Sequence, residues 1–559
     1  MAGLLIGANV RAPHAQEART AHVAPSHAPP MVLYTDLASG PNKGGEGNKG
    51  AYLSIFGKHF GDSGLGTRIK VLIGGVEVAN YRYLGKSKGR ADIQQLTVQV
   101  GALGNPPPGR PLPVQVIADG IRSNTDQTFT VNPGRILFVD NVTGNDLTAV
   151  PGDIHHPFRH VQTPTAAHSA FDVMSPGDVI VMRGTGVPWS DLGVDSYFIK
   201  FIAKNGSAPT GKIGTGPFTL TAYPGEDVFI DMDRNPSFKG GISGVDTTQW
   251  AGGRWITISD LRIESGGHSG VIAEQIKGDH WRIVNNDLSA ATGARSNAMA
   301  GGINGNGTSS YWVGNHIHDI SGGPQLLNHG IYIDGNGSYE VAYNWIQRVT
   351  GGSGFQIFVN GGNGSNYASH VHFHHNLISD VAKYGINIAD GSTADIAIYD
   401  NVVYNISGPG LRFNTNTLRG ARIFNNTFYG SDTNGNDYDG IITNDWWFPK
   451  NALTMRDNIF VLTSSRIPYS GGSVGMYAGA GIITHNLYWG GRGTPNFDRA
   501  PIIGDPRFVR PGSNFHLRTG SPAIGAGGGF TPAGPDFDCD GPDPSKTPGD
   551  IGALDYWPG

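Results

Sequence analysis

Two phrases that recur through the middle of the chain stand together in Asn376-Leu377-Ile378-Ser379-Asp380-Val381-Ala382-Lys383-Tyr384-Gly385-Ile386-Asn387-Ile388. The first is an Asn or Asp followed within two residues by an apolar residue. The second is a Gly followed by alternating apolar residues, as in Gly330-Ile331-Tyr332-Ile333 and Gly410-Leu411-Arg412-Phe413. Self-similarity of this kind is the mark of a solenoid. The first phrase recurs every 25 to 32 residues, at Asp260, Asn286, Asn315, Asn344, Asn376, Asn401, Asn426, Asn458 and Asn486.

Each interval is long enough for one coil of two or three short strands. Alternation with period two, with β-branched and aromatic residues between Gly, Asn, Asp and Ser turns, indicates β-strands rather than helices. We therefore predict an all-β fold dominated by a right-handed parallel β-helix, in which each coil buries its apolar row on the next. Asn suits the recurring bend because it tolerates left-handed backbone and can hydrogen-bond its equivalents in neighbouring coils.

Composition narrows the class of protein. The chain has 559 residues, enough for two or three domains, with 85 Gly and only 15% charged residues. Its formal net charge of −5 does not indicate a nucleic-acid-binding protein, which would carry a basic surface. Because Cys539 is the single cysteine, an internal disulfide framework and a cysteine-based zinc site are both excluded.

The first 30 residues are interpreted as a signal remnant and linker. A short apolar run at Leu4-Leu5-Ile6 precedes Ala12-Pro13-His14-Ala15, as at the end of a secretory signal, and a native disordered terminus is the alternative. We expect a secreted or periplasmic protein. No apolar run reaches the roughly 18 residues of a membrane helix, so no membrane span is expected.

Residues 31–133 are predicted to form a compact β-sandwich. Short alternating strands such as Tyr52-Leu53-Ser54-Ile55-Phe56 and Leu112-Pro113-Val114-Gln115-Val116 are separated by turns. Their order resembles the IPT/TIG domains, which are immunoglobulin-like modules. That resemblance implies a spacer or a carbohydrate-binding appendage, and we assign no chemistry to it.

Residues 134–503 are predicted to be the β-helix with its N-terminal cap, and 504–559 a closing segment that packs on it. Pro157-Phe158-Arg159-His160-Val161-Gln162, the amphipathic run from Ala166 to Met174 and Ser175-Pro176-Gly177-Asp178 resemble the entry of pectate-lyase-like β-helix proteins. Gly504-Asp505-Pro506-Arg507-Phe508 resembles the end of the same secreted bacterial polysaccharide-active proteins. The resemblance implies the fold more strongly than any reaction.

Aligning the second phrase on its Gly predicts a groove along one sheet of the β-helix. The residue after the Gly points inward, and the next points outward, giving Asn304, Tyr332, Gln356, Asn387, Arg412 and Ile442 along one face. Polar partners and flat aromatic platforms in a row suit a sugar chain. The predicted substrate-binding residues are Asn304, Gln356, Asn387, Tyr384, Asn414, Asp445 and Trp446.

The densest cluster in this groove is Asn328-His329-Gly330-Ile331-Tyr332-Ile333-Asp334. Eliminating a 4-linked uronate needs a base for the C5 proton, an acid for the leaving oxygen and a cation for the carboxylate. His329 or Tyr332 can supply the base or acid, and Lys383 or Arg412 the cation. The predicted catalytic residues are His329, Tyr332, Lys383, Arg412 and Asp334.

Three alternatives stay open. A glycoside hydrolase would use carboxylates such as Asp334, Asp390 and Asp445, whose implied separation of about 10 Å slightly exceeds the roughly 6.5–9.5 Å of an inverting pair. A uronate C5-epimerase would use the same groove. A non-enzymatic carbohydrate-binding or adhesive surface protein is the third alternative.

No metal site is predicted. His372 and His374 share one outward face, with His316 and His318 placed on a neighbouring set of rungs, but no carboxylate pair completes a site. Asp536, Asp538 and Asp540 have the alternating spacing of a calcium loop without its Glu, and are interpreted as a turn. No cofactor is required, although calcium is compatible with the sequence. The predicted partner is a polysaccharide substrate, bound by a monomer.

Overall fold

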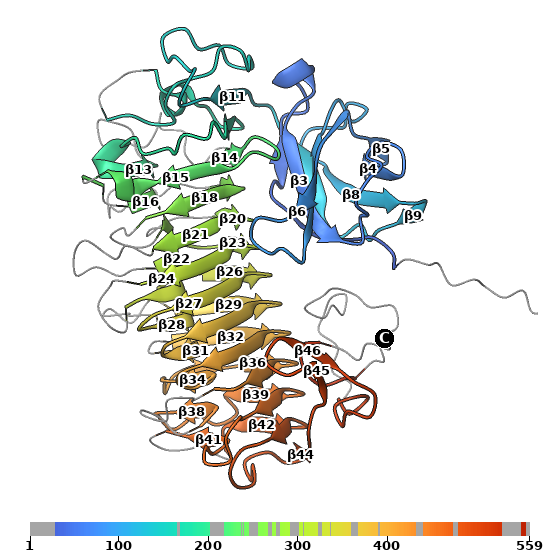
Figure 1. Ribbon diagram of the computed structural model, residues 1–559, viewed down its shortest axis with the longest axis vertical. Helices are drawn as coiled ribbons and strands as arrows, with labels where there is room; N and C mark the ends of the chain where they lie inside the picture. The colour runs from blue at the N-terminus through green and yellow to red at the C-terminus, as the bar shows by residue number, and fades with distance from the viewer. Residues whose placement is uncertain are drawn as a thin grey trace, which may run out of the picture.

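The fold is a parallel β-solenoid with a separate pair of sheets at its N-terminal side (Figure 1). The computed structural model describes residues 28–164, 168–201, 217–235, 237–238, 240–244, 255–265, 271–274, 280–290, 301–305, 307–321, 327–335, 337–358, 367–389, 392–431, 440–472, 479–527 and 549–554. Within them, the predicted all-β character and the predicted parallel coils are confirmed. The handedness of the coil and the immunoglobulin-like assignment stay predictions.

Three parallel sheets, which we call PA, PB and PC, make the solenoid. From β13 onward the chain passes through them in the repeating order PC, PA, PB. Sheet PA contains β11 (Ile136–Val139), β12 (Val179–Met182), β14 (Phe218–Ala222), β17 (Ile256–Ser259), β20 (Arg282–Val284), β23 (Ser310–Val313), β26 (Gly337–Ala342), β29 (Tyr367–His374), β32 (Ser392–Tyr399), β36 (Ala421–Phe424), β39 (Leu453–Arg456) and β42 (Gly481–Thr484), with β35 (Leu418–Arg419) beside β32. Sheet PB contains β15 (Val228–Asp231), β18 (Leu261–Glu264), β21 (Asp287–Ala290), β24 (His316–Ile320), β27 (Trp345–Val349), β30 (Leu377–Val381), β33 (Val402–Ile406), β37 (Thr427–Tyr429), β40 (Ile459–Val461), β43 (Leu487–Trp489) and β44 (Ile502–Ile503). Sheet PC contains β13 (Tyr197–Lys200), β16 (Gly240–Ser243), β19 (Ile272–Glu274), β22 (Gly301–Gly305), β25 (His329–Ile333), β28 (Ser353–Ile357), β31 (Tyr384–Ile388), β34 (Leu411–Phe413), β38 (Ile442–Asn444) and β41 (Ser470–Gly471).

The recurring asparagines form a continuous buried ladder at the bend between sheets PA and PB. Asn344 shows the pattern, because its Nδ2 donates to Asn376 Oδ1 (3.0 Å) and to the Trp312 carbonyl (2.9 Å). Its backbone N–H donates to the same Asn376 oxygen at 3.0 Å. The ladder ends where Asn486 Nδ2 donates to Asp498 Oδ2 at 2.8 Å. Its fully buried members are Asn286, Asn315, Asn344, Asn376, Asn401, Asn426, Asn458 and Asn486.

The left-handed backbone that we expected at the ladder lies one residue earlier. Asn285, Tyr343 and His375 have φ of 56°, 56° and 55°. Asp260, with φ of 61°, belongs to this earlier position and not to the ladder. Arg262 is in register with Asp287, so Asp260 is in register with Asn285. The ladder Asn thus keeps its side chain directed along the stack, while its neighbour makes the bend.

The recurring Gly of sheet PC marks a close approach of backbones. A Cβ at Gly330 would lie 2.3 Å from Ile346 Cγ2 and 2.6 Å from the Gly354 carbonyl oxygen. A Cβ at Gly385 would lie 2.6 Å from the Gly410 carbonyl oxygen. Side chains are therefore excluded at Gly330 and Gly385, which explains the second phrase of the sequence there.

One apolar core runs through the solenoid and is covered at its N-terminal end. Helix α1 (Ala170–Val173) begins with a capping box between Ser169 and Asp172, and Ala170 and Phe171 are buried in the core. This helix lies within the run from Ala166 to Met174 for which we predicted a cap; Ala166 itself lies outside the described residues. Within the described residues, no helix combines the length and apolar character needed to cross a membrane.

The N-terminal unit consists of two sheets that share an apolar cluster, and it lies alongside the first coils (Figure 1). Both sheets contribute to this cluster, for example through Leu53 and Val114. One sheet contains β1 (Met31–Thr35), β3 (Tyr52–Lys58), β7 (Gln94–Gln99) and β6 (Asn80–Lys86). The other contains β2 (Ser39–Gly40), β10 (Thr128–Val131), β8 (Pro111–Ala118), β4 (Ile69–Ile73), β5 (Val76–Glu77) and β9 (Ile121–Arg122).

The unit is fastened to the solenoid by buried polar contacts. Arg282 donates to the carbonyls of Thr35 (2.6 Å) and Asp36 (2.9 Å). The Asp260 carboxylate accepts from Ser54 Oγ and Gln95 Nε2, each at 3.0 Å. Asp36 itself accepts backbone N–H groups of Leu37 and Ser54. Burial, and then the nearby Asp260 carboxylate, raise the pKa of Asp36 well above its usual range.

The last described residues pack against the outer side of sheet PB. Phe508, Phe515 and Leu517, from the hairpin of β45 (Phe508–Arg510) and β46 (Asn514–Leu517), share an apolar cluster with Ile459 and Leu487. This cluster covers apolar side chains that a bare last coil would expose to water.

Replacing Asn376 by Ala should destabilise the middle coils by about 3 kcal/mol or more, because several buried donors and acceptors lose their partners at about 1–3 kcal/mol each. Among them are Asn344 Nδ2, Asn401 Oδ1 and the Val341 carbonyl. The urea midpoint followed by circular dichroism, together with amide exchange, measures the effect. Thr454→Ala, on the solvent side of β39, is the control, and equal midpoints for the two variants would show that the ladder contributes little.

Replacing Asp36 by Asn should stabilise the protein at alkaline pH. Because the pKa of Asp36 is raised by folding, the folded state keeps the Asp36 proton to a higher pH than the unfolded chain does. The folded state therefore loses stability as the pH rises from the ordinary carboxyl pKa to the raised one. The melting temperature of Asp36→Asn should therefore exceed that of the parent increasingly from pH 5 to pH 9. Asp119→Asn, an exposed acid of the same unit, is the control, and a difference that is independent of pH would contradict the assignment.

Candidate active site

The outer face of sheet PC carries the predicted polar row in strict register. Asn304 pairs with Tyr332, Tyr332 with Gln356, Gln356 with Asn387, and Asn387 with Arg412. Neighbouring strands lie about 4.8 Å apart, so Tyr332 and Arg412 stand roughly 14 Å apart along the row. The side chains expected to share one face therefore do so.

A groove of about 470 Å³ follows this row. It brings together eight of the twelve predicted site residues, namely His329, Tyr332, Lys383 and Arg412 from the catalytic set and Gln356, Asn387, Tyr384 and Asn414 from the substrate-binding set. The described lining residues include no Asp or Glu. The other lining residues are Leu327, Gly352, Ser353, Phe358 and Ala389.

His329 is buried and held as a neutral ring. Its Nδ1 accepts the backbone N–H of Ser353 at 3.1 Å, which places the proton of the neutral imidazole on Nε2. Burial lowers the pKa of His329 to about 3. In this state His329 can donate a hydrogen bond from Nε2, but it lacks a lone pair on that nitrogen with which to take a proton.

Tyr332 stacks on His329, with ring centroids 5.2 Å apart and planes inclined by 21°. Burial, and then the charge of Asp334 and a hydrogen bond to its carboxylate, raise the pKa of the Tyr332 hydroxyl far above its usual range. Asp334 does not line the groove itself. As the hydrogen-bond acceptor of the Tyr332 hydroxyl, it is suited to receiving the phenolic proton.

Two cations flank the aromatic ring of Tyr384. Lys383 Nζ lies 5.6 Å and Arg412 Cζ 4.5 Å from the ring centroid. Arg412 also forms an ion pair with Asp445 at 2.5 Å, and both side chains are about nine-tenths buried. Asp445 thus orients Arg412 from outside the groove, while Lys383 is half-buried at its edge.

Side-chain amides continue the row between these two ends. Asn387 Nδ2 donates to Gln356 Oε1 at 2.8 Å, and Ser353 Oγ donates to the same oxygen at 3.0 Å. Asn387 Oδ1 is buried without a hydrogen-bond partner among the described residues. This oxygen can accept a hydrogen bond from a hydroxyl group of a ligand.

The remaining predicted residues lie beyond the groove. Trp446 is half-exposed and donates from Nε1 to Asn414 Oδ1 at 3.1 Å, which places it at the far end. Asn304 is buried on the strand before Tyr332 and outside the lining set. Asp445 does not line the groove and contacts it through its ion pair with Arg412.

The structure shifts the last coil of the sequence alignment by one residue. Arg412 is in register with Thr443, so Ile442 is not the outward residue, and both Ile441 and Ile442 are buried. Ile441 therefore takes the place that Gly410 has in the coil before, and Gly440 stands one residue earlier. Asp390 lies outside the described residues, and so do the three aspartates of the calcium-like turn, Asp536, Asp538 and Asp540.

Sequence reasoning missed Ser353, which contacts His329 through its backbone and Gln356 through its side chain. The signal was present, because Ser353 precedes Gly354 as His329 precedes Gly330. The histidine pairs were also misplaced. His316 and His318 lie on β24 of sheet PB, whereas His372 and His374 lie on β29 of sheet PA.

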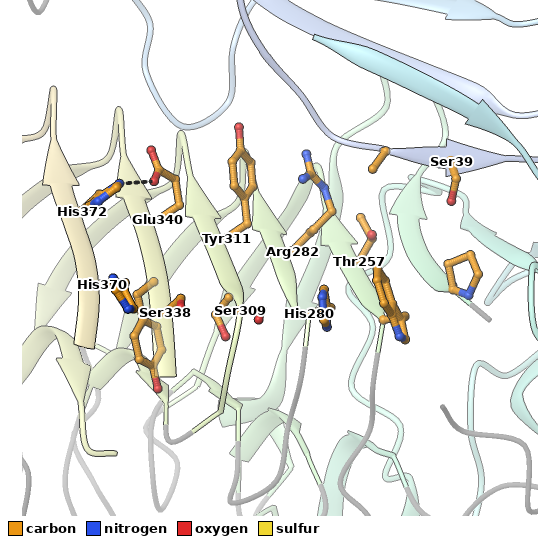
Figure 2. A pocket seen from close by; sticks show the side chains of 15 residues that line it. Ser39, Thr257, His280, Arg282, Ser309, Tyr311, Ser338, Glu340, His370 and His372 are labelled. Carbon is orange, nitrogen blue, oxygen red and sulfur yellow. Dashed lines mark ion pairs between the residues drawn. The ribbon is translucent and has the colours of Figure 1, made fainter. Parts of the chain in front are cut away.

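A second groove of about 440 Å³ lies on the outer face of sheet PA, beside the N-terminal unit (Figure 2). Thr257, Arg282, Tyr311, Glu340 and His372 form one row in register across five strands. A lower row includes His280, Ser309, Ser338 and His370, and Ser39 of the N-terminal unit stands at one end.

The charged groups of this second groove are bound to other protein groups. Arg282 donates to carbonyls of the N-terminal unit and lies 4.0 Å from the Tyr311 ring centroid. Glu340 pairs with His372 at 3.3 Å and with His374. Trp255 stacks on His280 at 3.7 Å. We take the groove of sheet PC as the candidate active site because it brings together eight of the twelve predicted site residues.

The fold and the groove define the class of protein as a parallel β-solenoid with an elongated, partly cationic cleft along one sheet. Searches of protein-family models and of curated proteins gave no match to this chain.

The His329 ring should remain neutral well below the ordinary histidine range of about 6.5. Because the unfolded chain takes up a proton at His329 more readily than the folded state, the folded state loses stability as the pH falls from about 6.5 towards the folded pKa of about 3. Histidine C2 hydrogen exchange, followed by mass spectrometry on the peptide that contains His329, measures this titration. The same peptide in the denatured chain is the control, and matching titrations in both states would contradict the buried tautomer.

Proposed function

We propose that this protein is a secreted or periplasmic polysaccharide lyase that cleaves a uronate-containing chain by β-elimination in the groove of sheet PC. The observation that carries the proposal is the composition of the groove: Lys383 and Arg412 line it together with His329 and Tyr332, and no described lining residue is acidic. An anionic sugar chain suits such a lining, since its carboxylates meet cations rather than like charges.

The proposed chemistry divides between two parts of the groove. Lys383 binds the uronate carboxylate, which lowers the energy of the carbanion-like state formed when the C5 proton leaves. The electron pair of the C5–H bond becomes the C4–C5 double bond as the C4–O4 bond breaks. The leaving oxygen then takes a proton.

Tyr332 is the proposed proton-transfer group. Its hydroxyl is bonded to Asp334, so the carboxylate can accept the phenolic proton as the phenol takes the proton from C5. His329, neutral and protonated on Nε2, is the proposed hydrogen-bond donor to the leaving oxygen, which takes the proton that the Tyr332–Asp334 pair removed from C5. Gln356 and Asn387 supply hydroxyl partners along the chain, and Trp446 a flat platform at the far end.

The two described carboxylates predicted for the hydrolase alternative, Asp334 and Asp445, do not lie at a working distance. Asp334 aligns with Phe358, Ala389, Asn414 and Asp445 on successive strands. That spacing separates Asp334 from Asp445 by roughly 19 Å, about twice the upper limit for an inverting pair. Asp445 is also bound to Arg412. These positions favour elimination over hydrolysis.

Tyr332→Phe and His329→Ala should each lower the rate of elimination about 10²- to 10⁴-fold, the usual contribution of a positioned acid or base. The assay incubates the protein with alginate, pectate and glycosaminoglycans and follows the ultraviolet absorbance of the unsaturated uronate. Lys383→Met should lower the rate by removing the cation that stabilises the carbanion-like state, and should also weaken binding of the anionic chain, an effect that shrinks at high salt.

His372→Ala, in the other groove, is the matched control and should retain full activity. Unchanged rates in Tyr332→Phe and His329→Ala would move the active site elsewhere. New reducing ends without absorbance would indicate a hydrolase, and solvent exchange at C5 without cleavage an epimerase. Retention of the polysaccharide without any product would indicate a binding protein.

A further inference from the structure

Three side chains on sheet PB converge on one point outside both grooves. Asp287 on β21 lies beside His316 and His318 on β24. His316 Nδ1 is 3.0 Å from Asp287 Oδ2, and His318 Nε2 is 3.0 Å from Asp287 Oδ1. Their ligand atoms all lie within 4.8 Å of one another, an arrangement that no other group of His, Cys, Asp or Glu attains among the described residues.

The other nitrogen of each imidazole is already engaged. His318 Nδ1 lies 2.6 Å from Asp319 Oδ2, and Arg348 holds that carboxylate in place at 2.6 and 2.8 Å. His316 Nε2 lies 2.7 Å from the side-chain amide of Gln347, whose oxygen and nitrogen are interchangeable at this contact. Each ring can therefore donate a hydrogen bond from its N–H to an outer partner, as the histidines of metal sites do.

With those protons placed outward, His316 Nδ1 and His318 Nε2 both turn a lone pair towards the Asp287 carboxylate. Lone pairs and a carboxylate at 3.0 Å repel unless a proton or a metal ion lies between them. A single cation bound to all three groups removes the repulsion at both contacts. The three side chains are 15–21% exposed, so an ion can reach them.

We propose that Asp287, His316 and His318 bind a divalent transition-metal ion of the zinc type. Two imidazole nitrogens and one carboxylate oxygen form a donor set that suits such ions, which prefer nitrogen more than calcium or magnesium do. The stacked rings of His316 and Trp345, 4.5 Å apart, support the site from the next strand. The bound ion joins consecutive coils at β21 and β24 and leaves further coordination positions for water.

Calorimetric titration of the purified, chelator-treated chain with Zn²⁺ tests the site. The parent should bind one ion and gain in melting temperature, and a chelator should reverse the gain. His316→Ala and His318→Ala should lose both effects. Asp319→Asn, which weakens the outer partner of His318, should reduce the affinity about 10- to 100-fold.

His372→Ala is the matched control, because His372 and His374 also share a carboxylate, Glu340, without forming a three-ligand group. This variant should bind Zn²⁺ as the parent does. Absence of Zn²⁺ binding in the parent would show that protons alone hold the cluster together and would overturn the proposal. Equal binding by the parent, His316→Ala and His318→Ala would overturn it as well. The readouts are binding and melting, so the result is independent of lyase activity.

Discussion

The hydrogen-bonded stack of buried asparagines is the constraint on which the rest of the solenoid depends. Each ladder Asn contacts the next coil through its Nδ2 and through its own backbone N–H, both directed to one amide oxygen. A side chain in any other register would leave these groups unpaired in a water-free interior, at a cost that no surface contact offsets. The ladder therefore keeps consecutive coils aligned, and aligned coils turn residues distant in sequence into straight rows.

Those rows give the three faces of the solenoid different chemistry. Sheet PC carries a cleft with cations and a buried neutral imidazole, sheet PA a groove whose charges are bound to other protein groups, and sheet PB the histidines that converge on Asp287. Because side chains on one strand repeat on the next at about 4.8 Å, a ligand on one face meets a series of similar positions. Such a series suits a polymer better than a small molecule.

The N-terminal unit adds to the solenoid a wall that coils alone do not provide. Its contacts bury Asp36 and Asp260 together, and Arg282 reaches from sheet PA to the carbonyls of Thr35 and Asp36. Two carboxyl groups in one dry contact are unfavourable when both are charged, so the docking favours a protonated Asp36. The same docking adds Ala38 and Ser39 of the N-terminal unit to the lining of the sheet PA groove, and Figure 2 shows Ser39 beside the row.

The repeat of Asn and Gly was enough to predict the parallel coils and the row from Tyr332 to Arg412, because a period of two fixes which side chains face outward. The protonation and the pairing of those side chains could be read only from the tertiary structure. The neutrality of His329 depends on its burial and its tautomer on the backbone N–H of Ser353. The orientation of Arg412 depends on Asp445, 33 residues away. The convergence of Asp287 with His316 and His318 likewise depends on the register between coils, since the loops that separate strands differ in length and the sequence alone does not specify which residues meet. Sequence thus determined the periodic fold and its outward rows, whereas tertiary structure decided protonation, pairing and the second groove, because these depend on burial and on contacts between segments far apart in the chain.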